Sequence, residues 1–155
     1  MALRNFTVSS KLAAAPDTVW QHAISPSGVN REFQPLLRMT FPAGASDISN
    51  NWAPGKRLFR SWILFAGIFP LECDNIVFEE VEPGHRFLER SSMLTQRVWE
   101  HERVIEPCSQ GCRVSDRVCF ESRLKSLEWF FLPVFKATFR WRHRKLLGLF
   151  GAQAA

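Results

Sequence analysis

Trp99-Glu100-His101-Glu102-Arg103-Val104-Ile105 and, after a turn over 107–111, Val114-Ser115-Asp116-Arg117-Val118-Cys119-Phe120 alternate in character along their length. Successive side chains of a β-strand point to opposite faces of the sheet, so each run has one apolar and one polar face. His101, Arg103 and Asp116 fall on the apolar face, where an unpaired polar group costs roughly 1–3 kcal/mol. We therefore predict a concave, partly hydrated face on which Arg103 or His101 hydrogen-bonds to Asp116.

The rest of the chain shows the short strands and short turns of an antiparallel meander. Alternating or β-branched runs predict strands over 6–12, 37–41, 57–64, 71–81, 86–92, 99–106 and 113–121, joined mostly by short turns. Pro16 and Asp17 open a short helix, which Pro26-Ser27-Gly28 interrupts, and a second short helix is expected over 29–33. Residues 42–56 are expected to form a loop. Apolar residues at helical spacing predict one long helix from Ser126 to about Phe150.

This order of elements, with particular residues in it, resembles the START-like helix-grip superfamily, also called SRPBCC or polyketide cyclase/dehydrase-like. The matching pieces cover nearly the whole chain: Ala15-Pro16-Asp17-Thr18-Val19-Trp20, Pro54-Gly55, Pro83-Gly84, Phe87-Leu88-Glu89, Trp99 to Arg103, Gly111, Val114 to Val118, and Arg142-His143-Arg144-Lys145-Leu146. The resemblance implies an α+β fold in a single domain over 1–155. About seven curved antiparallel strands would wrap around the C-terminal helix, with an apolar cavity between sheet and helix.

The resemblance also implies which side chains line that cavity. It puts Phe87, Glu89, Trp99, His101, Arg103, Asp116 and Val118 on the concave face, and Trp62, Phe135 and Phe139 are further candidates. The superfamily has no shared catalytic set, so no catalytic residue is assigned. Asp116 has two readings that do not exclude each other: a polar anchor for a ligand, or a buried ion pair that joins two strands.

The long helix carries a basic segment. Residues 123–145 hold seven Lys or Arg and one acid, whereas residues 72–106 hold nine acids and four bases. We expect complementary solvated faces rather than a nucleic-acid site, because no nucleic-acid motif accompanies the basic segment. Arg140, Arg142, Arg144 and Lys145 are expected on the solvated side of the helix. His22 and His143 are expected to be solvated or hydrogen-bonded within the fold.

Composition narrows the class of protein further. The chain has 155 residues, of which 14 are Phe and six are Trp, with no Tyr, as suits an apolar interior. The four cysteines (Cys73, Cys108, Cys112, Cys119) are expected to be reduced thiols, and the four scattered histidines lack metal-ligand spacing. We expect no cofactor, no metal and no integral membrane segment. The N-terminus lacks the pattern of a signal peptide, so a cytoplasmic location is expected.

Three functions remain open. The first is binding of a hydrophobic small molecule, such as a lipid, polyketide or aromatic metabolite. The second is a cyclase or dehydratase that acts on a polyketide-like substrate, with His101 and either Asp116 or Glu89 as acid and base. The third is a module that binds a membrane surface or a partner through the basic, aromatic C-terminal helix.

Overall fold

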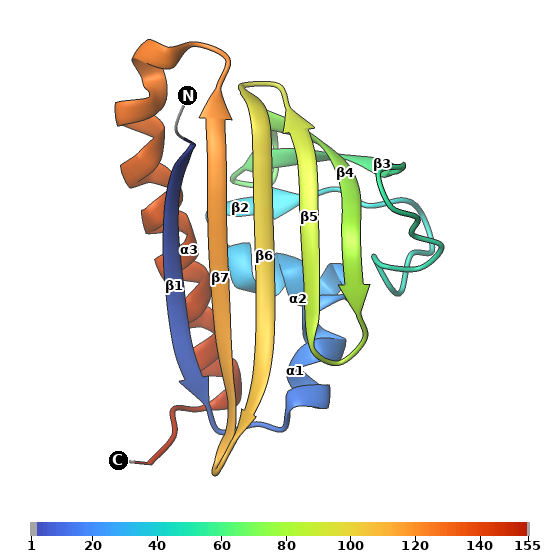
Figure 1. Cartoon of the computed structure of the whole chain (residues 1–155), viewed down its shortest axis with the longest axis vertical. Helices are drawn as coiled ribbons and strands as arrows, with labels where there is room; N and C mark the ends of the chain where they lie inside the picture. Colours follow the sequence, from blue (N-terminus) through green and yellow to red (C-terminus); the bar gives the residue numbers. More distant parts are fainter. Residues whose placement is uncertain (1–2, 155) are drawn as a thin grey trace.

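The computed structural model describes residues 3–154, which form a seven-stranded antiparallel sheet with three α-helices (Figure 1). The strands follow the order β1-β7-β6-β5-β4-β3-β2 across the sheet. Their bounds are β1 (Arg4–Leu12), β2 (Leu37–Met39), β3 (Arg57–Phe65), β4 (Phe69–Glu82), β5 (Arg86–Met93), β6 (Gln96–Cys108) and β7 (Gly111–Ser122). The helical segments are α1 (Pro16–Ala23), α2 (Pro26–Phe33), the 3-10 turn η1 (Lys125–Leu127) and α3 (Glu128–Phe150). The predicted helix-grip fold is confirmed.

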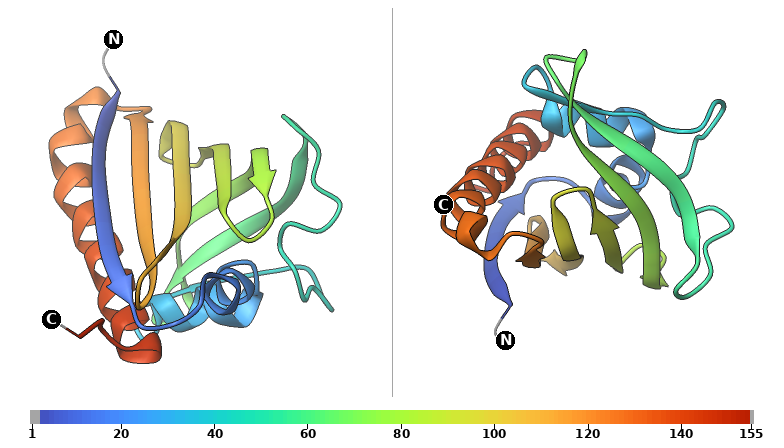
Figure 2. Two further views of the ribbon diagram at one scale, coloured as in Figure 1. Left: turned by 60° about the horizontal axis from the view of Figure 1, so that its bottom comes forward. Right: turned by 90° about the horizontal axis from the view of Figure 1, so that it is seen from above.

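The sheet curls strongly, and the helices lie on its concave side (Figure 2). In the pairing of β6 with β7, Arg103 lies opposite Asp116 and His101 lies opposite Val118. Trp99, His101 and Arg103 are buried, whereas the glutamates between them are only half-buried. A shift of one residue in this register would turn every one of these side chains to the other face. The predicted shared face of His101, Arg103 and Asp116 is therefore confirmed.

The two short helices follow each other with almost no linker. The Ser25 hydroxyl caps α2 by accepting a hydrogen bond from the Gly28 backbone N–H at 3.0 Å. The expected start of this helix at residue 29 is wrong, because Pro26 is its first residue, where the missing N–H would have no helical partner anyway. A Cβ at Gly28 would lie 1.9 Å from the His22 carbonyl oxygen, so only glycine permits this close approach.

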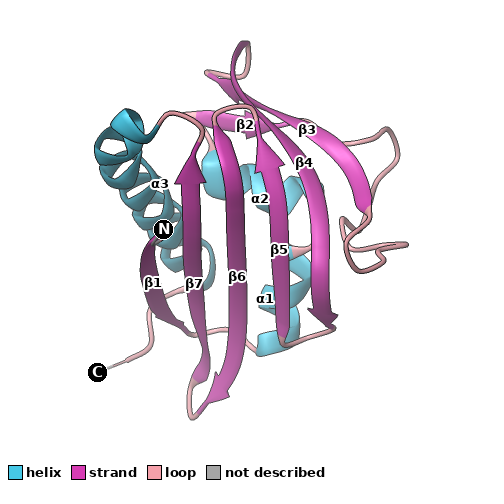
Figure 3. Cartoon of the chain, turned by 45° about the horizontal axis from the view of Figure 1, so that its top comes forward, coloured by secondary structure: helices cyan, strands magenta, loops and turns pink. Residues whose placement is uncertain are grey.

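The long helix α3 packs against β1, and the residues after its C-terminal end are hydrogen-bonded to the end of β1 (Figure 3). The Ala13 N–H donates to the Gly151 carbonyl at 2.9 Å, and Leu12 forms an isolated bridge with Ala152. Phe139, Arg142, His143 and Leu146 form the buried side of α3. The expected solvated position of Arg142 is therefore wrong: it lies one helical turn from Phe139 and from Leu146, on the same stripe.

Two groups of buried apolar side chains fill the space under the sheet. One joins α1, the middle of the sheet and the end of α3 through Trp20, Ile105 and Leu146. The other joins β1, β6, β7 and α3 through Phe6, Trp99 and Phe139. Among residues 3–154, no helix combines the length and the apolar character needed to cross a bilayer.

Candidate functional site

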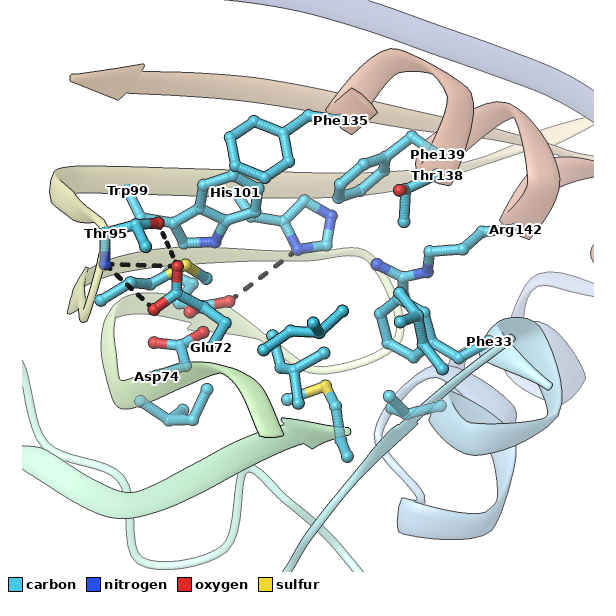
Figure 4. A pocket seen from close by; sticks show the side chains of 18 of the residues that line it. Phe33, Glu72, Asp74, Thr95, Trp99, His101, Phe135, Thr138, Phe139 and Arg142 are labelled. Atoms are coloured by element: carbon cyan, nitrogen blue, oxygen red, sulfur yellow. Dashed lines mark hydrogen bonds and ion pairs between the residues drawn. The ribbon is translucent and has the colours of Figure 1, made fainter. Parts of the chain in front are cut away.

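A cavity of about 490 Å³ lies between the concave face of the sheet and the helices α2 and α3 (Figure 4). Its wall is mainly apolar and contains nine phenylalanines and one tryptophan: Phe33, Phe41, Phe59, Phe78, Phe87, Trp99, Phe130, Phe131, Phe135 and Phe139. The polar side chains on the wall are Glu72, Asp74, Glu89, Thr95, His101, Thr138 and Arg142. In Figure 4, Glu72, Asp74 and Thr95 lie at one end of the cavity, and Phe33 and Arg142 lie at the other.

Six of the ten predicted lining residues lie on this wall: Phe87, Glu89, Trp99, His101, Phe135 and Phe139. The aromatic ones contact each other edge to face. The ring of Trp99 is 5.0 Å from that of Phe135, and the ring of His101 is 5.0 Å from that of Phe139. Such contacts fix the ring positions and keep the wall rigid around the open volume.

The other four predicted residues lie elsewhere. Val118 is fully buried in the core, and Arg103 and Asp116 lie behind the wall in a network of ion pairs. Their face was predicted correctly, but other side chains separate them from the open volume. Trp62 is 43% exposed and does not line the cavity. Of its neighbours on the strand, Ser61 is buried and Ile63 lines the cavity.

Arg103 is the centre of the buried network. Its guanidinium donates to Glu32 of α2 through two bonds, Nη1 to Oε1 at 2.8 Å and Nη2 to Oε2 at 3.0 Å. It donates to Asp116 through Nε to Oδ1 at 2.8 Å and Nη2 to Oδ2 at 2.7 Å. Arg142 of α3 adds a bond from its Nε to Glu32 Oε2 at 2.8 Å. Two carboxylates therefore meet two guanidinium groups, so that their charges balance inside the fold.

Asp116 has no capacity left for a ligand. Oδ1 lies 2.8 Å from His101 Nε2, and Oδ2 lies 2.8 Å from His143 Nε2, in addition to the two bonds from Arg103. An ionised carboxylate only accepts hydrogen bonds, at about four sites, so both Nε2 atoms carry a proton and donate. His143 Nδ1 is 2.7 Å from the Ser10 hydroxyl. The expectation that His143 is hydrogen-bonded within the fold is confirmed. Asp116 forms the buried ion pair with Arg103 that joins β7 to β6.

The electrostatics of the network keep both acids ionised. Burial alone would raise the pKa of Glu32, but the charges of Arg103 and Arg142 outweigh burial and hold that pKa well below its usual range. Likewise, burial opposes ionisation of Asp116, and the charges of Arg103 and then His101 lower its pKa well below the usual value. Glu32 and Asp116 are therefore fixed negative charges that balance the two arginines.

A second polar group lies on the wall, and only Glu89 among its acids was predicted. Glu72, Asp74 and Glu89 come from the adjacent strands β4 and β5, and all three line the cavity. The Glu72 carboxylate accepts from the backbone N–H of Cys73 at 3.0 Å and of Thr95 at 3.1 Å. Glu89 Oε1 accepts from the Ser91 hydroxyl at 2.7 Å. The sequence did indicate Asp74, because it is spaced by two residues from Ile76 and Phe78 and so falls on the same apolar face of the strand.

The cysteines and histidines form no further centre in residues 3–154. All four cysteines are free thiols, and burial raises the pKa of Cys112 and Cys119. Within the same residues, no three His, Cys, Asp or Glu side chains are arranged to hold a metal ion.

A protein-family model described as Domain of unknown function (DUF8410) matches residues 10–150. The chain belongs to the DUF8410 family. No curated protein matches the sequence of this DUF8410 chain.

Solved structures share its fold at low sequence identity. Protein CV1439 from Chromobacterium violaceum has a TM-score of 0.72 and 13% identity, over 97% of this chain and 99% of that one. The ZhuI aromatase/cyclase from Streptomyces sp. R1128 has a TM-score of 0.68 and 10% identity, over 94% of this chain and 92% of that one. The di-domain aromatase/cyclase StfQ from the steffimycin biosynthetic pathway has a TM-score of 0.66 and 10% identity, over 94% of this chain and 49% of that one. The DUF8410 chain therefore has the fold of these proteins.

Proposed function

We propose that this protein binds one hydrophobic small molecule, a lipid, polyketide or aromatic metabolite, in the cavity between the sheet and α3. The observation that carries the proposal is the open volume of about 490 Å³ behind an aromatic wall. Pockets for drug-sized ligands span roughly 300–1,000 Å³ and are mostly apolar with a few placed polar groups. The shared fold with ZhuI and StfQ, both described as aromatase/cyclases, supports the same class of ligand.

The test is binding of a polarity-sensitive dye to the native protein, together with native mass spectrometry for a copurifying ligand. Ile63→Trp should fill the cavity and abolish dye binding, because Ile63 of β3 lies on the wall. Leu64→Trp is the matched control, since Leu64 is the next residue on the same strand and does not line the cavity. Equal dye binding by both variants, with both folded by circular dichroism, would contradict the proposal.

One observation favours catalysis as a second candidate function. His101 is fixed from behind by Asp116 through Nε2, and its Nδ1 lies on the cavity side, 3.9 Å from Glu89 Oε2. A positioned histidine and a carboxylate on one apolar wall are suited to moving a proton in a cyclisation or dehydration. Asp116 is saturated and off the wall, so Glu89 is the acid or base of this candidate. Glu89→Gln should then abolish turnover of a polyketide-like substrate while dye binding persists.

Exposed apolar side chains favour a third role, contact with a membrane surface. The β3–β4 turn, the β5–β6 turn and the start of α3 lie toward one end of the molecule (Figure 3), and each carries such side chains. We call them the apolar rim: Ile68, Phe69, Leu71, Leu94, Leu124, Trp129 and Phe130. Leu71 and Phe130 are also part of the cavity wall. Exposed Arg123 and Lys125 lie beside Leu124 and would favour an anionic lipid surface.

A further inference from the structure

Asp74 is a buried carboxyl group with one oxygen that has no hydrogen-bond partner. Only 2% of the residue is exposed, and its Oδ1 atom is fully buried with no hydrogen bond to the protein. A buried polar atom left unpaired costs roughly 1–3 kcal/mol, so a fold keeps one only where something else meets it. Asp74 lines the cavity, at the end where Figure 4 shows Glu72 and Thr95. Asp74 therefore reaches the cavity wall with one oxygen that no group of the protein meets.

The charges around Asp74 are one-sided. Glu72 of β4 lies at the same end of the cavity, and Glu89 of β5 lies close enough for its charge to act on Asp74. The bonding partners of these two acids are Ser91, Thr95 and backbone N–H groups, which carry no charge. From β6, His101 faces Glu89 with Nδ1 at 3.9 Å, and its Nε2 is already bonded to Asp116. Burial and then the charge of Glu89 raise the pKa of Asp74 well above its usual range. The raised pKa favours the protonated form of Asp74, whose proton would be shared with the Glu89 carboxylate.

The positive groups of the cavity are committed elsewhere. Arg142, the guanidinium on the wall, donates to Glu32 and lies 4.6 Å from the centre of the Phe33 ring. In Figure 4 it lies at the opposite end of the cavity from Asp74. The wall between the two ends is aromatic, which suits both an apolar body and an organic cation.

We propose that the paired carboxyls of Asp74 and Glu89 are the recognition site for a protonated amine on an otherwise apolar ligand. This inference rests on the proposed binding function and specifies its ligand class. The ammonium group takes the place of the proton: Asp74 releases H⁺ to solvent, and the N–H groups of the ligand donate to the two carboxylates. The apolar body of the ligand then extends along the aromatic wall toward Phe33.

The experiment compares three ten-carbon probes, decylamine, decanol and decanoate, by isothermal titration calorimetry below their micelle concentrations. We expect decylamine to bind at least about tenfold tighter than decanol at neutral pH, and decanoate to bind weakest. Titration in two buffers of different ionisation enthalpy should report release of about one proton per bound decylamine. The preference for decylamine should grow as pH rises across the neutral range, because the proton on Asp74 then leaves more easily.

Asp74→Asn tests the residue itself. It keeps the shape and removes the acid, so the amine preference and the proton release should both be lost while decanol binding persists. It should also raise the melting temperature at pH 8 and change it little at pH 4, because a raised pKa destabilises the fold only above the unfolded-state pKa. Glu79→Gln is the control, since it also replaces an acid of β4 by its amide but at a position that does not line the cavity.

The outcomes separate the two proposals. Tight binding of decanol with no preference for decylamine would overturn the amine site and leave the binding function standing. Binding of none of the three probes would overturn both. An amine preference that survives in Asp74→Asn would assign the recognition to other groups and overturn the role of Asp74.

Discussion

Arg103 and Glu32 are 71 residues apart in the chain and face each other through two parallel bonds of 2.8 and 3.0 Å. Because the second oxygen of Glu32 also accepts from Arg142, this one carboxylate joins the sheet, α2 and α3. A two-bond contact between guanidinium and carboxylate fixes direction as well as distance. The cavity wall formed by these three elements therefore depends on a side chain that does not line the cavity.

Glu32→Ala should destabilise the protein strongly, by about 3–5 kcal/mol. The reason is that both Arg103 and Arg142 would remain buried and charged with one partner fewer. The unfolding midpoint in urea measures the loss. Glu100→Gln is the matched control, since Glu100 pairs with a largely exposed Arg90 and should cost less than about 1 kcal/mol. Equal losses in the two variants would contradict the role of Glu32.

Asp116 predicts how stability depends on pH. Its folded-state pKa is lowered, so its contribution is fully present above the unfolded-state pKa of about 3.9 and is lost as pH falls below it. The wild-type unfolding midpoint should thus fall steeply between about pH 5 and pH 3, and Asp116→Asn should flatten that fall. Asp17→Asn, at an exposed position, should keep the wild-type slope. A wild-type slope in Asp116→Asn would show that another group governs acid stability.

Trp99→Ala should alter ligand binding more than stability. The indole lines the cavity, so its removal enlarges an existing space instead of creating a closed void. Phe120→Ala is the comparison: Phe120 is fully buried and does not line the cavity, so its loss should cost about 3–5 kcal/mol and change dye affinity less than Trp99→Ala does. Dye titration and thermal unfolding of both variants measure the difference. A large loss of stability in Trp99→Ala without a change in dye affinity would indicate a solid interior.

Trp129 predicts the behaviour of the apolar rim. It is 73% exposed at the start of α3, and Trp129→Ser should weaken sedimentation with vesicles that contain phosphatidylserine. Binding should also weaken as salt is raised, because Arg123 and Lys125 contribute through charge. Leu149→Ser alters an exposed apolar residue at the other end of the same helix and should bind as wild type does. Identical sedimentation of both variants would contradict contact through the rim.

The strands and part of the site were predictable from alternation, and the arrangement of sheet, helix and cavity followed from the family resemblance. The pairing of β6 with β7 follows from where Trp99, Arg103 and Asp116 fall in their runs, and the same pattern placed His101 on the cavity side. Alternation shows which face of the sheet a side chain lies on, but it does not show whether that side chain reaches the cavity. Arg103 and His101 share a face, yet only His101 reaches the wall, because Glu32 of α2 covers Arg103.

The partners from the helices were harder to predict. Nothing in the local sequence brings Glu32 to Arg103, because the contact depends on how two short helices fold back over the sheet. Arg142 could have been found, since it continues the apolar stripe of Phe139 and Leu146. Asp74 could have been found too, because it lies on the same strand face as Ile76 and Phe78, just as Asp116 lies on the same face as Val118. In each case a charged residue on an apolar stripe was the signal.

The polar attachments of α3 are distributed unevenly along the helix. Its strong attachments, Arg142 to Glu32, His143 to Asp116 and Gly151 to Ala13, all lie in its second half. At the other end the tie from Arg4 to Glu128 is exposed, and Pro133 removes one backbone hydrogen bond. The first half of α3 is held differently, by aromatic packing of Phe135 against Trp99 and Phe120. Charge and backbone bonds therefore hold one end of the helix to the fold, and ring contacts with the cavity wall hold the other.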